Sequence, residues 1–271
     1  LLIAVLTITL WGLLNLPSEE PHWPSRVQGF SFQPMREDDD PTDGVYPTTS
    51  EIDEDLALLQ DEAFAVRTYS VAETLAQVPQ LAAGRGLNVT LGAWLDNRLE
   101  PNEEESEREE LRIEQLIDYL GRVRSRVWAP VSTAEPWHVW IDNPVLADHT
   151  DFIAVHILPY WEGIPVDAAV DYVAMRHEQL RKAFPGKEIV IAEVGWPSNG
   201  RTRMGAEASL SNQTRFLRRF LSLAEREDYV YYLMEAFDQP WKSQIEGAIG
   251  SYWGVFDTAR EPKFAFTSPV V

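Results

Sequence analysis

A carboxylate stands at the end of one apolar, β-branched run of the sequence. Residues 189–194 follow the breaker pair Pro185-Gly186 and predict a buried strand that carries Glu193 near its end. Gly195 and Trp196 come directly after it. Because the C-terminal ends of parallel barrel strands carry the chemistry in such folds, the pattern predicts a catalytic carboxylate beside a ring that could stack on a sugar. The alternative is a structural glutamate held in a hydrogen-bond network.

Polar and aromatic residues recur at the ends of the other predicted strands. If the strands close a barrel, one cleft gathers Tyr69, Trp94, Asp96, Glu135, His156, Tyr160, Trp161, Glu193, Trp196, Glu235, Asp238, Trp241 and Lys242. Glycoside cleavage needs two carboxyl groups: one protonates the leaving oxygen and the other attacks the anomeric carbon or activates water, about 5 Å apart for retention. The recurrence therefore favours glycoside chemistry, although a single Trp at a strand end is more often a packing residue.

The elements that must position these residues alternate between strand and helix. The strand-like runs are 27–32, 65–71, 88–96, 127–134, 152–158, 189–194 and 229–237. The helix-like runs begin at Ser50 and continue around Leu75 to Leu81, around Leu116 to Val123, at 166–184 and at 211–224, with Ser211 as the expected cap of the last. This alternation predicts an α/β fold, a (β/α)8 TIM barrel. The alternation of strands and helices is interrupted between Asn97 and Arg126, where the fourth βα unit is missing.

Composition limits the function classes. The net charge of -20 disfavours nucleic acid or an anionic membrane surface as partner, because both would repel the chain. The absence of cysteine excludes thiolate catalysis and Cys-ligated zinc. The five histidines lack ligand spacing, and no glycine-rich phosphate loop is present, so we expect neither a metal nor a cofactor. A neutral substrate suits these features best.

The first residues are uncharged and strongly apolar. We interpret residues 1–16 as a membrane anchor or signal-anchor remnant, residues 17–25 as a linker, and residues 26–271 as one barrel domain. The alternative for the first segment is an amphipathic core helix, which its lack of a polar face disfavours.

Four motifs together resemble one known family. Glu193-Val-Gly-Trp-Pro-Ser198, Arg67-Thr-Tyr69, His156-Ile-Leu-Pro-Tyr-Trp161 and Phe237-Asp-Gln-Pro-Trp-Lys242 are similar to motifs of glycoside hydrolase family 17, the β-1,3-glucanase family, in its bacterial branch. The resemblance extends from about residue 28 to residue 264.

The resemblance implies a (β/α)8 barrel and a retaining mechanism in which Glu193 is the nucleophile. It implies a β-glucan endo-hydrolase or transglycosylase that acts on β-1,3-glucan in oligosaccharide or polysaccharide form. The residues implied to bind substrate are Tyr69, Glu135, His156, Tyr160, Trp161, Trp196, Glu235, Asp238, Trp241 and Lys242. Bacterial members are often membrane-anchored and partnered to glucan synthases, which implies an inner-membrane protein with its catalytic domain in the periplasm.

One departure from the family concerns its acid/base. The family carries this group in a Val-Gly-Asn-Glu motif at the end of the fourth strand, and no such motif occurs here. Either the sequence joins two segments across an omitted stretch near Glu110 and Leu111, or the protein lacks the fourth unit; unpaired strand edges argue for the first. Glu135 is then only a weak candidate acid. A non-catalytic β-glucan-binding module associated with a synthase is the alternative function.

Overall fold

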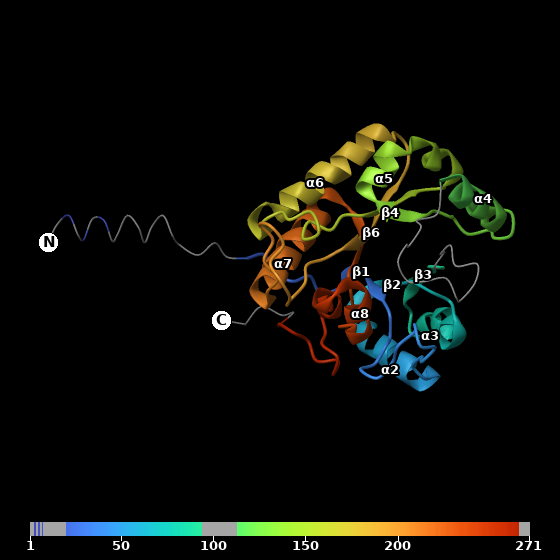
Figure 1. Ribbon diagram of the computed structural model, residues 1–271, viewed down its shortest axis with the longest axis horizontal. Helices are drawn as coiled ribbons and strands as arrows, with labels where there is room; N and C mark the ends of the chain where they lie inside the picture. The colour runs from blue at the N-terminus through green and yellow to red at the C-terminus, as the bar shows by residue number, and fades with distance from the viewer. Residues whose placement is uncertain (1–2, 4, 6, 8–19, 94–112, 266–271) are drawn as a thin grey trace.

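The protein is built on one curled, parallel, seven-stranded sheet. The computed structural model describes residues 3, 5, 7, 20–93 and 113–265. The strands are β1 (Val27–Phe32), β2 (Ala63–Thr68), β3 (Asn88–Thr90), β4 (Ala134–Pro136), β5 (Ile153–His156), β6 (Ile189–Val194) and β7 (Val230–Leu233). Their order in the sheet is β3-β2-β1-β7-β6-β5-β4, and every pair is parallel (Figure 1). The expected α/β architecture with parallel strands is confirmed.

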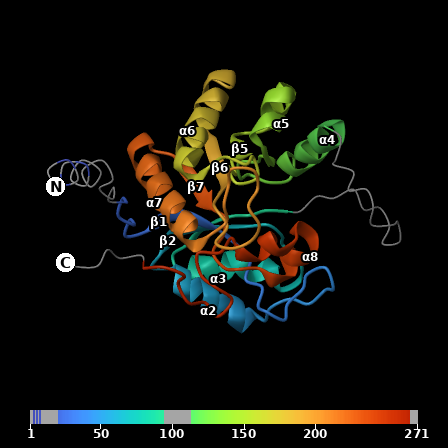
Figure 2. The same cartoon turned by 60° about the vertical axis from the view of Figure 1, so that its left-hand side comes forward.

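Helices cover the outer face of this sheet. The α-helices are α2 (Thr49–Leu59), α3 (Val78–Gly84), α4 (Ile113–Arg124), α5 (Trp137–Asp142), α6 (Val166–Ala183), α7 (Leu210–Glu227) and α8 (Ser243–Glu246). The 3-10 turns are η1 (Glu73–Gln77), η2 (Pro144–His149), η3 (Pro240–Lys242) and η4 (Ala248–Tyr252). Figure 2 shows the curved sheet between the group α4 to α7 and the pair α2 and α3.

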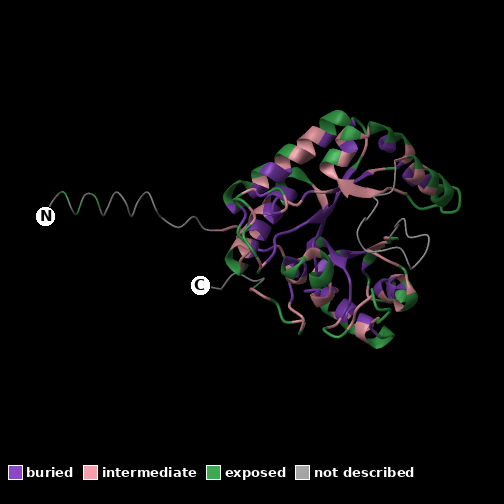
Figure 3. Ribbon diagram, in the orientation of Figure 1, coloured by how far each residue is buried: buried purple, intermediate pink, exposed green. Residues whose placement is uncertain are grey.

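The core lies between the strands and these helices. Phe216 and Phe220 of α7 are fully buried, and the ring of Phe220 packs edge-on against Tyr231 of β7, with ring centroids 5.1 Å apart. Buried positions concentrate along the central strands, whereas the outer faces of the helices are exposed (Figure 3). The helices are amphipathic, and burying their apolar faces is the main driving force for this arrangement.

Two expected helix starts are shifted by about one turn or less. The helix expected from Ser50 begins at Thr49, and its cap is Thr48, whose hydroxyl accepts a hydrogen bond from the amide of Glu51 in a capping box. The helix expected to be capped by Ser211 is capped by Ser209, which accepts a hydrogen bond from Asn212. In both helices an earlier side chain satisfies a free backbone amide of the first turn.

The sheet has two open edges in the described part of the chain. The runs expected as long strands are 88–96, which is described as far as residue 93, and 127–134. In the described residues they form strands at Asn88–Thr90 and Ala134–Pro136. Residues 127–133 form no strand: Pro130 lacks an amide hydrogen, and no described strand pairs with this side of β4. The expected closed barrel is therefore a half-barrel over the described ranges, and the site of the missing fourth unit, with residues 110 and 111, falls outside them.

The segment before β1 packs on α7. Glu20 forms an ion pair with Arg219 at 2.7 Å, and the carbonyl of Pro21 accepts a hydrogen bond from Arg218. Trp23 is buried, so the latter part of the expected linker lies on the domain. Most of the expected anchor over residues 1–16 is outside the described residues; within the described ones, no helix has the length and apolar character to span a membrane.

Candidate functional site

An extra residue in β6 brings Glu193 to the inner side of the sheet. Val155 of β5 pairs with Ile191, and the next residue, His156, pairs with Glu193, so β6 advances two positions while β5 advances one. The register with β7 shifts over the same stretch of β6. A bulge of this kind turns a side chain toward the opposite face, and bulges are common beside active sites. Glu193 and His156 therefore face each other.

Glu193 is held by a buried guanidinium. Its Oε1 accepts a hydrogen bond from Arg67 Nη1 at 3.0 Å and lies 3.4 Å from His156 Nε2, and only 10% of the Glu193 side chain is exposed. Burial alone would raise the pKa of Glu193, but the charges of His156, Arg67 and Lys242 outweigh it and lower that pKa. Burial lowers the pKa of His156, so this side chain is neutral at pH 7. Arg67 is then the close cation that keeps the Glu193 carboxylate ionised.

A second buried ion pair lies near the first. Both oxygens of Glu235 accept hydrogen bonds from Lys242 Nζ, at 2.8 and 2.9 Å, and Glu235 has no exposed surface. Burial raises the pKa of Glu235 to about 7, an effect that Lys242 partly opposes. The ring of Tyr69 lies 5.0 Å from both the Arg67 guanidinium and the Lys242 ammonium, so it links the two pairs. Burial, with the charges of Glu193 and Glu235, raises the pKa of Tyr69 well above its usual value.

Asp238 lies in a different network. Its Oδ1 accepts hydrogen bonds from Lys263 Nζ at 2.6 Å and from the Gly254 amide at 2.9 Å. Burial raises the pKa of Asp238 to about 6, although Lys263 opposes the shift. Asp238 therefore contacts the segment that follows η4, and none of its hydrogen bonds among the described residues reaches Glu193.

The expected sugar-stacking aromatic residues fall into two groups. Tyr160 and Trp196 are fully buried: Tyr160 donates to the carbonyl of Arg201, and Trp196 Nε1 donates to the carbonyl of Glu207. Burial leaves these two rings no face for a ligand. Trp161 and Trp241 are half-buried, so they are the better candidates for contact with a sugar.

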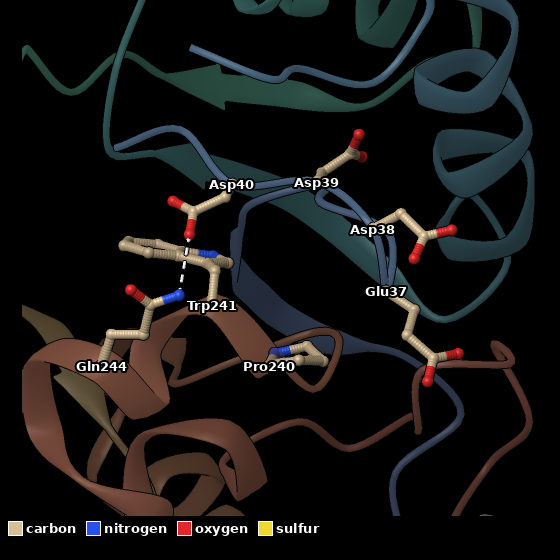
Figure 4. A pocket seen from close by; sticks show the side chains of 7 residues that line it. All are labelled: Glu37, Asp38, Asp39, Asp40, Pro240, Trp241 and Gln244. Atoms are coloured by element: carbon tan, nitrogen blue, oxygen red, sulfur yellow. Dashed lines mark hydrogen bonds between the residues drawn. The ribbon is translucent and has the colours of Figure 1, made fainter. Parts of the chain in front are cut away.

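Trp241 borders a shallow acidic pocket. A hollow of about 220 Å³ is lined by Glu37, Asp38, Asp39 and Asp40 on one side and by Pro240, Trp241 and Gln244 on the other (Figure 4). Gln244 Nε2 donates a hydrogen bond to Asp40 at 3.1 Å across it. The hollow adjoins the Trp241 loop and its lining does not include Glu193.

Glu135 lies on the short edge strand β4. It pairs in register with Val155, and the next residue, Pro136, pairs with His156. Successive residues of a strand face opposite sides, so this register places Glu135 on the face opposite His156. Its Oε1 accepts a hydrogen bond from Thr133 at 2.6 Å. The structure thus does not bring Glu135 to the Glu193 cluster, while Trp94 and Asp96 lie outside the described residues.

Sequence reasoning left two of the charged partners without a role. Arg67 stands in the motif Arg67-Thr-Tyr69 at the end of β2, and its position at a strand end is the signal that could have identified it. Lys263 lies in the C-terminal segment in no motif, and only the structure shows its contacts. Among the described residues, no group of three or more His, Asp or Glu side chains is arranged to hold a metal ion.

Comparisons with known proteins place this geometry in context. The model of the BtgE/BtgC glycoside hydrolase domain matches residues 102–254. A glucan 1,3-beta-glucosidase of Arthroderma benhamiae is 26% identical over 267 residues, which cover 82% of this chain and 86% of that protein. A putative glucan endo-1,3-beta-glucosidase btgC of Aspergillus niger is 28% identical over 170 residues, covering 55% of this chain; the match spans only 25% of that relative.

The fold has a close counterpart among solved structures. A family 17 β-1,3-glucanosyltransferase from Rhizomucor miehei superposes with a TM-score of 0.75 at 22% identity, covering 89% of this chain and 98% of that one. The same enzyme has been solved, as an active-site mutant, in complex with laminaritriose. At this identity the likeness shows a common fold of the TIM-like glycoside hydrolase type. The family model matches more than half of the sequence, and the chain therefore belongs to the BtgE/BtgC glycoside hydrolase domain family.

Proposed function

We propose that the protein is a retaining β-1,3-glucan hydrolase or glucanosyltransferase in which Glu193 is the nucleophile. The observation that carries the proposal is the buried Glu193 carboxylate, turned inward by the β6 bulge and paired with Arg67 at 3.0 Å. A carboxylate kept ionised at this position can attack an anomeric carbon. The names of the relatives, glucan 1,3-beta-glucosidase and β-1,3-glucanosyltransferase, support the substrate class.

The proposed reaction has two steps. Glu193 forms a bond to the anomeric carbon as the bond to the leaving oxygen breaks, which gives a glycosyl-enzyme. Water then yields hydrolysis, whereas a sugar hydroxyl yields transfer. In the first step Arg67 orients Glu193, and the half-buried Trp161 and Trp241 are the candidates to contact the sugars.

The leaving oxygen also needs a proton. Glu235 is close to the nucleophile, but it is fully buried and bonded to Lys242 through both oxygens, so it is not placed to protonate a bound glycoside. Glu135 faces away from His156 in the sheet register, so it remains only the weak candidate that the sequence offers. A test of Glu193 as the nucleophile therefore needs a substrate whose leaving group departs without a proton donor.

An activated donor provides such a test. We would mix the protein with 2,4-dinitrophenyl β-laminaribioside, whose leaving group departs without protonation, and follow dinitrophenolate release and protein mass. We expect a burst equal to the enzyme concentration and a mass increase of one laminaribiosyl unit, both lost in Glu193→Gln. Added laminaritriose should give longer products if the protein is a transferase and shorter ones if it is a hydrolase.

The second candidate function is a non-catalytic β-glucan-binding module. It is favoured by the sequence, which lacks the Val-Gly-Asn-Glu motif that carries the acid/base in the family it resembles. Laminaritriose binding by calorimetry without a burst from the activated donor would favour this module over the enzyme.

The cellular setting is also a proposal. We infer that residues 1–16 anchor the protein in a bacterial inner membrane, with residues 26–271 in the periplasm and a glucan synthase as partner. The uncharged apolar composition of the first segment supports an anchor. Fractionation of bacterial cells that express the chain with and without residues 1–16 tests it: only the longer protein should sediment with membranes.

A further inference from the structure

One buried lysine connects the two loops that carry the candidate site. Lys263 Nζ donates hydrogen bonds to Ser198 Oγ at 2.8 Å and to Asp238 Oδ1 at 2.6 Å. Ser198 lies in the loop that follows β6, here called the Glu193 loop after the residue at the end of that strand. Asp238 lies between β7 and η3, in the segment here called the Lys242 loop. The Lys263 side chain is only 9% exposed, so its ammonium is almost wholly taken up by these contacts.

The backbone attaches each loop separately to the chain around η4. The Ser198 amide donates to the carbonyl of Tyr252 at 2.8 Å, and the Asp238 amide donates to the carbonyl of Phe256 at 3.0 Å. These bonds do not join one loop to the other. The two segments meet directly at the strand ends, where the Met234 amide donates to the carbonyl of Val194 at 2.8 Å. Farther along both segments, Lys263 contacts the two loops at once with a single ammonium group.

The lysine carries an energetic cost that a packing residue would not have. Burial lowers the pKa of Lys263, and Asp238 opposes that shift. A buried ion pair of this kind is often no more stable than apolar residues of the same volume, and such pairs can instead specify one arrangement of the elements that they join. At this place the arrangement is that of the Glu193 loop relative to the Lys242 loop.

We propose that Lys263 is a positioning residue for the reaction at Glu193, holding the Glu193 loop and the Lys242 loop in one fixed relation. The inference rests on the proposed function, since the loops matter for catalysis only if Glu193 is the nucleophile. Lys263 itself is not placed against the substrate. It acts by keeping Glu193 beside Arg67 and Lys242 beside Tyr69.

The test compares Lys263→Met with a matched control in the same segment. Arg260→Met removes another buried cation, which donates to Asp55 at 2.8 and 3.0 Å on the side of α2 and to neither site loop. Its guanidinium lies 4.5 Å from the ring of Phe237, a contact that a methionine side chain can keep. With the activated laminaribioside we expect Lys263→Met to lower the burst rate about tenfold to a hundredfold at saturating donor, with KM little changed. Arg260→Met should keep the rate within about twofold, although it also removes a buried ion pair. Lys263→Arg, which keeps the charge, should recover part of the rate.

A second measurement decides the proposal without catalysis. Amide hydrogen exchange, read by mass spectrometry, should be faster in both site loops of Lys263→Met than in wild type, and unchanged there in Arg260→Met. Equal burst rates in the two variants, or equal exchange in these loops, would overturn the positioning role. A wild-type protein that gives no burst would instead refute the proposed function, and the exchange result would still report on the connection between the loops.

Discussion

Two regions of the molecule differ in how their charged side chains are buried and paired. The first, here called the ion-paired wall, comprises residues 189–198, which include β6, residues 230–242, which include β7, and residues 254–263. Its buried acids all have cationic partners, as in the pairs of Glu235 with Lys242 and Asp238 with Lys263. The second, here called the open edge, comprises β3 and residues 113–136, which include α4 and β4. There the strands are three residues long, and the side chain of Trp128 is fully exposed.

This difference indicates which interactions hold the residues of a functional site in place. A buried carboxylate is costly unless a cation meets it at a defined distance, so each pair in the ion-paired wall constrains the loops on which its members stand. At the open edge few polar groups are buried, and small displacements there break no such pair. We therefore expect the position of Glu193 to depend on the ion-paired wall, and four predictions test the contrast between the two regions.

The largest effect on stability should come from breaking a pair of the ion-paired wall. Lys242→Met leaves the fully buried Glu235 without its cation, which should lower the free energy of unfolding by about 3–5 kcal/mol. The control at the open edge is Arg124→Met, which removes an ion pair to Asp151 whose side chains are 40% and 35% exposed. Solvent screens that pair, so the control should lose at most about 1 kcal/mol in urea titrations.

The same variant has a defined pH dependence. Burial raises the pKa of Glu235 above its unfolded value, to about 7, so the folded state binds the proton more tightly and Glu235 reduces stability as the pH rises from about 4.5 to about 7. Without Lys242 that pKa rises further. The deficit of Lys242→Met should therefore be larger at pH 8 than at pH 5; a deficit independent of pH would show that Glu235 does not depend on Lys242 for its charge.

The next effect concerns the close approach of two backbones in the ion-paired wall. A Cβ atom at Gly195 would lie 2.1 Å from the carbonyl oxygen of Met234, whose amide donates to Val194 at 2.8 Å. Neither strand can move away without losing this hydrogen bond. Gly195→Ala should cost about 1–3 kcal/mol and displace Glu193, seen as a lower burst rate. If Gly195→Ala kept both the stability and the burst rate of the wild-type protein, the two strands would be loosely held at this point.

Sequence patterns predicted the central strands better than the edge strands. Ile189–Val194 and Val27–Phe32 are strands over the predicted residues, because their β-branched and aromatic runs lie between two paired neighbours. The runs at 88–96 and 127–134 have similar propensity but form three-residue strands. The length of a strand depends on the hydrogen bonds that its neighbours offer, and a single run of residues does not contain that information.

The same limit applies to the candidate site. Glu193 was identifiable because its place at a strand end is a local feature. Its contact with Arg67 joins residues 126 positions apart, and the β6 bulge that turns it inward depends on the registers of both neighbouring strands. Burial separates Trp196, which is in the core, from Trp241, which keeps accessible surface, although both follow predicted strands. Chemistry-bearing positions could thus be predicted, but their partners and exposure could not.

The smallest effect should have the opposite sign and lies at the open edge. Gly121 is within α4, and a Cβ atom added there would meet nothing within 4 Å. Glycine in a helix loses more conformational entropy on folding than alanine, so Gly121→Ala should raise the free energy of unfolding by about 0.5–1 kcal/mol and leave the burst rate unchanged. Paired urea titrations of Gly121→Ala and Gly195→Ala measure the contrast directly. If Gly121→Ala were destabilising by a similar amount to Gly195→Ala, α4 would be packed as tightly as the ion-paired wall, and the distinction between the two regions would not hold.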